Sequence, residues 1–165
     1  MQVPIRKPGK YTHLKPDPHL TEGKFNEIKN KLQRLKEIRP EAAREVRRLA
    51  ELGDLSENAA YQIAKGRLRG INQEMLELED HLHSAIIIKQ DEYTDTVKLG
   101  HKVTAEIAGK QITYLILGSS ETNPSEGIIS SSSPIGSALL GHKAGDKVKI
   151  NQKNKIIEFQ IIKVE

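Results

Sequence analysis

Apolar residues recur at alternating steps of three and four along two long stretches of the chain. The first series is Phe25, Ile28, Leu32, Leu35, Ile38, Ala42, Val46 and Leu49; the second is Leu68, Ile71, Met75, Leu78, Leu82 and Ala85. This spacing gives each helix a narrow apolar seam that only another helix can cover. A short turn containing Gly53 separates the two stretches, so each is the nearest partner of the other. The pattern predicts an antiparallel coiled-coil hairpin over residues 21–84.

Local signals bound the first helix and mark its middle. Thr21 is a suitable N-cap, and a helix from Glu22 to Leu52 would hold about 31 residues and extend roughly 45 Å. Pro40 has no amide hydrogen to donate within a helix, so we expect a kink or a brief break there.

Beyond Ser84 the hydrophobic period changes from helical to alternating. Residues 103–107 and 112–116 alternate around a turn at 108–111, which predicts a β-hairpin. Short strands are expected at 126–130, 147–150 and 156–164, and one or two helical turns at 135–140. Residues 85–165 therefore form a small, mostly antiparallel domain, and the fold class is α+β.

Composition limits the classes of protein to which the chain can belong. The chain has no cysteine, and no apolar run approaches the roughly 20 residues of a membrane span. No signal-peptide core is present near the start, so we expect a cytoplasmic protein with no membrane partner. Residues 1–20 form a proline-rich, basic extension, which we expect to be irregular, either draped on the surface or in contact with a partner. A formal charge of +4 is too small to argue for nucleic-acid binding alone.

The turn between the helices carries two carboxylates, Asp54 and Glu57, within the string GDLSENAAY at residues 53–61. Their spacing fits a capping box, with Asp54 as the N-cap of the second helix. Acidic side chains also suit the positive end of a helix dipole. Capping alone does not explain why so long an arm ends in so small and acidic a tip.

This tip resembles that of the Gre transcript-cleavage factors of bacterial RNA polymerase (GreA/GreB). Three further strings resemble the family in order: LTEG at 20–23, RPE at 39–41, and SPIGSALLG at 133–141 followed by Gly145 and Asp146. The resemblance runs from about residue 19 to the C-terminus. It departs at Ala60, where the family often has Glu, and in residues 1–18.

The resemblance implies a factor that lends carboxylates to a backtracked polymerase. Asp54 and Glu57 would help to hold a second Mg²⁺ and a water in the polymerase active site, with Ser56, Asn58 and Tyr61 supporting the tip. Mg²⁺ prefers hard oxygen ligands and keeps several waters, so two extra carboxylates suffice. No tightly bound cofactor is expected on the isolated chain. The expected partners are RNA polymerase and the nascent RNA 3′ end. We expect the protein to bind them as a monomer.

Basic residues flank the tip and define what we call the basic collar: Arg44, Arg47, Arg48, Lys65, Arg67 and Arg69. An antiparallel hairpin brings both sides of the collar to similar heights behind the acids. The collar could bind RNA phosphates, or it could be an ordinary solvated face, because acids are interspersed. The resemblance favours RNA binding.

By the same resemblance, the C-terminal domain is FKBP-like. This raises the possibility of a prolyl isomerase, but residues 91–165 offer only Tyr93, Tyr114 and Phe159 to line an aromatic pocket. We therefore expect a docking module. The histidines receive no role; His81 and His83 are too closely spaced for two ligands on one helix face.

Three functions remain open. The first is stimulation of transcript cleavage, which the tip acids favour. The second is a Gre-like inhibitor that occludes the same channel of the polymerase. The third is an RNA-binding coiled-coil arm unrelated to polymerase, which would need the collar but not the acids. The sequence does not distinguish a GreA-like from a GreB-like cleavage preference.

Overall fold

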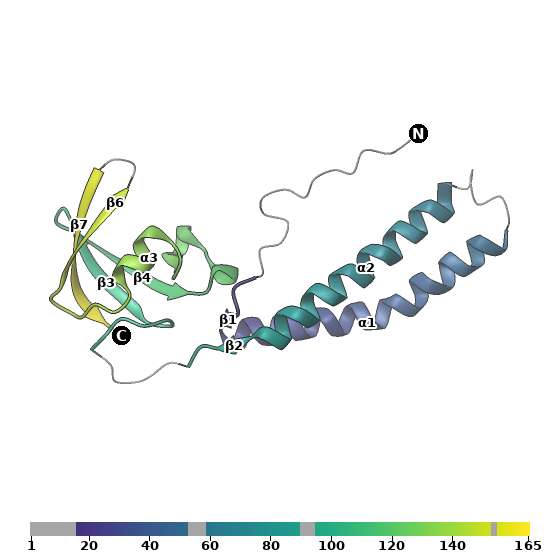
Figure 1. The fold of residues 1–165 in the computed structure, drawn as a ribbon, viewed down its shortest axis with the longest axis horizontal. Helices are drawn as coiled ribbons and strands as arrows, with labels where there is room; N and C mark the ends of the chain where they lie inside the picture. Colours follow the sequence, from purple (N-terminus) through teal and green to yellow (C-terminus); the bar gives the residue numbers. More distant parts are fainter. Residues whose placement is uncertain (1–15, 53–58, 90–94, 153–154) are drawn as a thin grey trace.

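The computed structural model describes residues 16–52, 59–89, 95–152 and 155–165. The molecule is elongated, with a helical hairpin at one end and a curled β-sheet at the other (Figure 1). Within the described ranges no helix is long and apolar enough to cross a bilayer.

The hairpin consists of α1 (Glu22–Glu51) and α2 (Ala59–Ser84). Thr21 is the N-cap of α1, as predicted, and its Oγ1 accepts a hydrogen bond from the Lys24 amide at 3.2 Å. The helix continues through Pro40, so the brief break considered from the sequence is not observed. Pro40 is exposed, and water can therefore satisfy the carbonyl group that loses its amide partner.

The two helices bury a common apolar seam. Its buried members are Ile28, Leu32, Leu35, Ala42 and Leu49 on α1, and Ala64 and Ile71 on α2. Ile38 was predicted to lie in the seam but is 41% exposed. A straight helix drifts relative to a strict seven-residue repeat, and this drift moves a seam position to the edge of the contact. Ion pairs also cross between the helices, with Lys31 Nζ 2.6 Å from Glu74 and Lys36 Nζ 2.8 Å from Glu79.

The C-terminal domain is a five-stranded sheet in the order β5-β4-β3-β7-β6. Its strands are β3 (Lys102–Ile107), β4 (Lys110–Leu117), β5 (Ile128–Ser130), β6 (Lys147–Gln152) and β7 (Lys155–Val164). All neighbours pair antiparallel except β4 and β5, which are parallel. The predicted α+β class is confirmed, and one edge of the predicted antiparallel sheet is mixed.

One apolar core fills this domain. Phe159, Ile116, Ile161 and Val103 are almost completely buried, together with Leu139 of the short helix α3 (Pro134–Leu139). Between β4 and β5 lie two single-turn 3-10 helices, η1 (Ser119–Glu121) and η2 (Pro124–Glu126). Of these two turns, η1 places Ser119 and Glu121 against residues 17–21 at the root of the hairpin.

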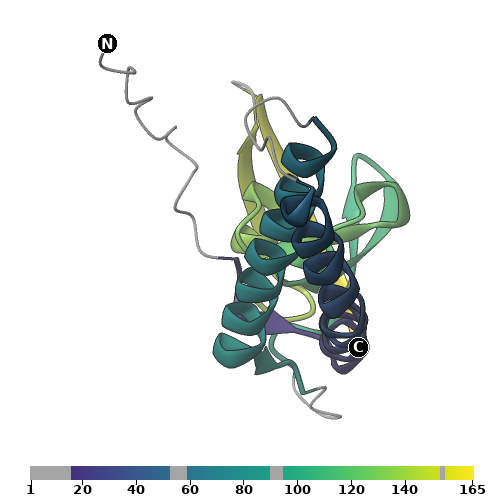
Figure 2. The same ribbon diagram turned by 90° about the vertical axis from the view of Figure 1, so that its right-hand side faces the viewer.

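A second, two-stranded sheet lies at the root of the hairpin. It pairs β1 (His19–Leu20) with β2 (Ile86–Ile87) in parallel, with His19 opposite Ile86. The view along the arm places this small sheet beside the helix ends, with the large domain behind (Figure 2). The end of the predicted N-terminal extension is therefore ordered structure that packs at the junction.

Candidate functional site

The tip residues Asp54, Ser56, Glu57 and Asn58 lie outside the described residues. They belong to the segment between α1, which ends at Glu51, and α2, which begins at Ala59. The loop therefore joins the two helix ends that lie farthest from the C-terminal domain (Figure 1). With 30 residues in α1 at 1.5 Å each, the far end of α1 lies roughly 45 Å from the root. The catalytic assignment of Asp54 and Glu57 remains a prediction.

Tyr61 lies in the first turn of α2 and is half-buried. The Lys65 Nζ atom lies 5.6 Å from the centroid of the Tyr61 ring, at cation–π distance. This contact orients the ring against the helix next to the tip and draws Lys65 toward it. The structure thus couples one collar residue to one tip-support residue. Neither predicted role is tested by this geometry.

Three collar residues converge on one surface depression. Arg44 and Arg48 from α1 and Arg67 from α2 line it together with Glu41 and Glu45. The closest pair is Arg67 Nη1 and Glu45 Oε2 at 3.8 Å, and both side chains are well exposed. Such a pair contributes little to stability, so Arg67 can be recruited by a stronger anion. Arg47 and Arg69 are exposed but do not line this depression.

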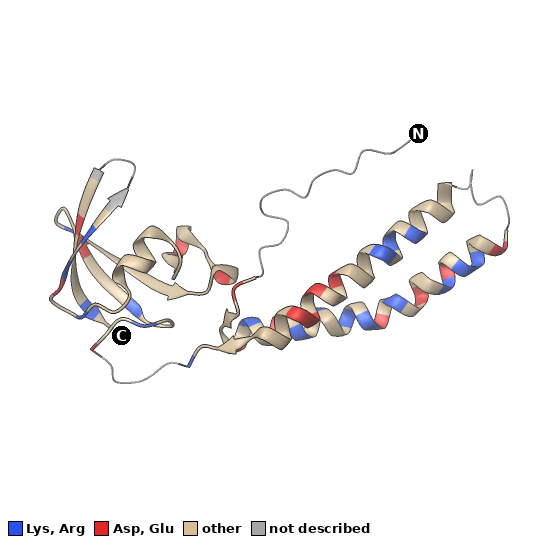
Figure 3. Cartoon of the chain, viewed as in Figure 1, with Lys and Arg blue, Asp and Glu red and all other residues tan. Residues whose placement is uncertain are grey.

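Charge is graded along the arm. Acidic side chains gather on α2 near the root, where Glu74 and Glu79 pair with lysines of α1. Basic side chains predominate toward the tip (Figure 3). The collar is therefore the basic end of a polar rod. Among the described residues, no group of three or more His, Asp or Glu side chains could hold a metal ion.

Two of the three aromatic candidates for an isomerase pocket are used in packing. The rings of Tyr114 and Phe159 lie 6.5 Å apart between centroids, tilted by 49°, and Phe159 is almost fully buried. Burial raises the pKa of the Tyr114 hydroxyl. Tyr93 lies outside the described residues. These two rings contribute to the core of the sheet.

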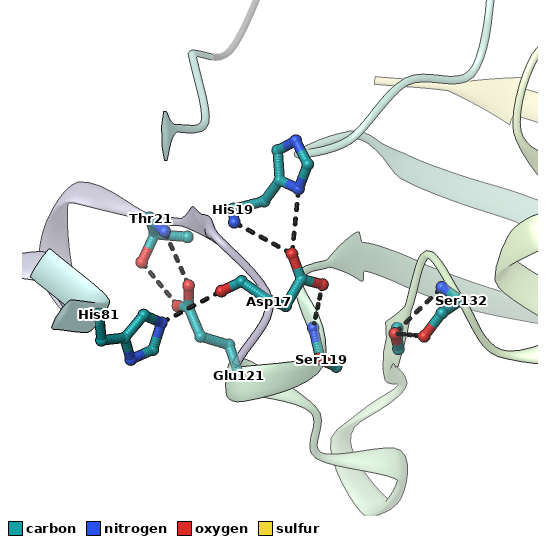
Figure 4. A network of polar contacts seen from close by, with 8 residues as sticks. Asp17, His19, Thr21, His81, Ser119, Glu121 and Ser132 are labelled. Carbon is teal, nitrogen blue, oxygen red and sulfur yellow. Dashed lines mark hydrogen bonds and ion pairs between the residues drawn. The ribbon is translucent and has the colours of Figure 1, made fainter. Parts of the chain in front are cut away.

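Sequence reasoning missed a polar cluster at the root of the hairpin. His81 was given no role, yet it is buried and its Nε2 lies 3.1 Å from the Asp17 carbonyl oxygen. Glu121 accepts hydrogen bonds from Thr21 (Figure 4). The partners are 64 and 100 residues apart in sequence, so no local spacing could have revealed them.

Comparisons with known proteins cover both parts of the chain. The family described as "Transcription elongation factor, N-terminal" matches residues 19–87, and "Transcription elongation factor, GreA/GreB, C-term" matches residues 90–165. The transcription elongation factor GreA of Thermomicrobium roseum is 42% identical over 133 residues, covering 79% of this chain and 85% of that protein. GreA of Macrococcus caseolyticus is 39% identical, and the match covers 85% of this chain and 94% of that protein. Among solved structures, the GreA factor homolog 1 (Gfh1) of Thermus thermophilus is 26% identical, covers 90% of this chain and 99% of its own, and has a TM-score of 0.42.

Proposed function

Because this chain belongs to the GreA/GreB family of transcription elongation factors, we propose that it acts on bacterial RNA polymerase arrested by backtracking. In this proposal the arm enters the secondary channel of the polymerase and stimulates cleavage of the extruded RNA. The observation that carries the proposal is the arm itself: α1 extends roughly 45 Å, and three collar arginines line one depression on it. The sequence places Asp54 and Glu57 between the two helices of this arm.

The chemistry of the tip follows from its donor set. Asp54 and Glu57 supply carboxylate oxygens, which are the ligands that Mg²⁺ prefers. Hydrolysis of a phosphodiester by two metal ions needs one ion on the attacking water and one on the leaving oxygen. The polymerase would supply the rest of the site, and the two tip acids would retain the second ion and orient the water. The chain then stimulates an activity that belongs to the polymerase.

The collar would bind the RNA behind the scissile bond. Arg44 lies seven residues before Glu51, the last residue of α1, or about 10 Å along the helix axis. Arg48 and Arg67 face the same depression. Arginine binds phosphate oxygens through two donors at once, so this cluster suits an RNA backbone better than a free metal ion.

The C-terminal domain would dock on the polymerase. Its two described aromatic side chains pack together, which argues against an aromatic pocket for proline. The full chain should therefore show no prolyl isomerase activity on a proline-containing peptide. Measurable turnover would revive the enzyme hypothesis.

A Gre-like inhibitor is the second candidate, because the same arm could occlude the channel without promoting cleavage. The two functions differ in what is measured. A cleavage factor shortens RNA in arrested complexes and restarts them, whereas an inhibitor slows elongation and leaves the RNA length unchanged.

The deciding experiment separates catalysis from helix capping. Asp54→Asn keeps the capping ability, because Asn caps a helix about as well as Asp, but it removes a good Mg²⁺ ligand. If the ligand supplies about 3 kcal/mol of transition-state stabilisation, cleavage falls roughly 10²-fold. Polymerase affinity stays constant, and added Mg²⁺ partly restores the rate.

The same series can refute the assignment. Normal cleavage by Asp54→Asn, combined with loss of helix content in Asp54→Ala, would make Asp54 a cap and not a metal ligand. Glu57→Gln provides the matched test for the second acid.

A further inference from the structure

The root of the arm is joined to the C-terminal domain by a short strap, residues 17–21. Glu121 of η1 accepts hydrogen bonds from the Thr21 amide at 2.7 Å and from Thr21 Oγ1 at 2.6 Å. Thr21 is also the N-cap of α1. A carboxylate of one domain thus lies at the positive end of the first helix of the other, where the helix dipole favours a negative charge.

Asp17 ties three elements together. Its Oδ2 accepts from the Ser119 amide at 2.9 Å, and its Oδ1 lies 3.0 Å from both the amide and the ring Nδ1 of His19. Its carbonyl oxygen can only accept, so His81 Nε2 donates to it from α2. The Asp17 side chain is only 14% exposed. One residue therefore connects η1, β1 and α2 (Figure 4).

A close backbone approach gives independent support. A Cβ atom placed on Gly118 would lie 2.1 Å from the carbonyl oxygen of His19. The dihedral angles of Gly118, −66° and 160°, are open to any residue. Glycine is needed here for space and not for conformation. The end of β4 thus rests directly against β1, and the adjacent Leu20 is completely buried.

The length of the arm makes this joint important. Over about 45 Å, a tilt of roughly 10° at the root displaces the tip by about 8 Å. Catalytic groups must be held within about 0.5 Å of their productive positions. A freely swinging arm would spend little time with its tip aligned.

We propose that Glu121, Asp17 and Gly118 form a positioning joint that fixes the angle of the arm relative to the C-terminal domain. The joint lets a docked C-terminal domain aim the tip; this second statement rests on the proposed function. Glu121 and Asp17 are positioning residues, because they act through α1 and β1 and never touch the RNA.

The absence of cysteine from the chain makes the angle measurable. Spin labels on Arg34→Cys in α1 and Lys110→Cys in β4 report a distance between the two parts in the full-length protein. Both positions are exposed and lie outside the joint, the tip and the collar. We expect one narrow distance distribution for the parent pair. Glu121→Ala and Gly118→Ala should broaden or shift it while helix content is unchanged, and Gly66→Ala, at an open glycine of α2, should leave it as it was.

Cleavage assays complete the test. With saturating factor, both joint variants should lower the maximal cleavage rate by about 10-fold or more, since misplacement of reacting groups by 1 Å can cost about 10²-fold. Their affinity for polymerase should not change.

Distance distributions identical to the parent in both variants would overturn the joint. Altered distances with unimpaired cleavage would overturn the aiming role. If the parent protein stimulates no cleavage, the proposed function fails, while the distance measurement still tests the joint. Should Gly118→Ala not fold, Glu121→Ala and Asp17→Asn carry the same test.

Discussion

Two glycines in the middle of α2 should lower the stability of the arm. Gly66 and Gly70 are exposed and lie in the helix interior, and a Cβ atom placed on either would have no heavy atom within 4 Å. Replacing both by alanine therefore introduces no clash. Each glycine costs a helix about 0.8–1.0 kcal/mol relative to alanine, chiefly through backbone entropy in the unfolded chain. The double variant should be more stable by roughly 1.5–2 kcal/mol.

The assay is thermal unfolding followed by far-ultraviolet circular dichroism, which is dominated by α1 and α2. For a unit of 60–100 residues, about 1 kcal/mol raises Tm by roughly 4–8 °C, so the double variant should gain roughly 6–16 °C if the hairpin unfolds as one unit. Gly136→Ala is the opposing control, because its Cβ would lie 2.1 Å from the Ser130 carbonyl oxygen. It should destabilise the C-terminal domain. An unchanged or lower Tm for the double Gly66→Ala, Gly70→Ala variant would refute the entropic argument.

Three further predictions follow from single features. The pKa of Asp17 is lowered: burial opposes ionisation, but hydrogen bonds from the Ser119 and His19 amides and the His19 ring outweigh it. Its contribution to stability is therefore present at neutral pH and lost as pH falls below about 4, so the stability difference between the parent and Asp17→Asn should shrink over that range. Ala108 has φ of +49° in the two-residue turn between β3 and β4, so Ala108→Asn should raise the unfolding free energy of the C-terminal domain by about 1 kcal/mol in urea titrations; a decrease would contradict this. Replacing Arg44, Arg48 and Arg67 by alanine should weaken binding to backtracked complexes and reduce its salt dependence; equal salt slopes would make this cluster a solvated face.

Much of the fold was accessible from the sequence because its signals are local. The apolar seam at steps of three and four predicted both helices. The alternation on either side of Ala108 and Gly109 predicted the β3–β4 hairpin. Ile38 shows the limit of this reasoning, since a heptad pattern does not reveal how far a straight helix drifts from the seam.

The joint could not be predicted because its residues look ordinary in sequence. Asp17 lies in a proline-rich, basic stretch, and Glu121 follows two serines. Their importance arises from contacts across about 100 positions. Gly118 carries no signal either, because its dihedral angles are common and only the neighbouring strand excludes a side chain.

The charge gradient along the arm has a consequence for how the protein meets its partner. At 0.1 M ionic strength the Debye length is about 10 Å, a fraction of the roughly 45 Å arm. A negatively charged surface beside the collar therefore interacts with the collar arginines and hardly at all with the acids near the root (Figure 3). Encounters of such a surface with the collar are attractive, and encounters with the acidic face of α2 near the root are repelled. The orientation of the arm therefore affects the encounter before contact is made. The association rate depends on the charges of the collar and not on the net charge of the chain.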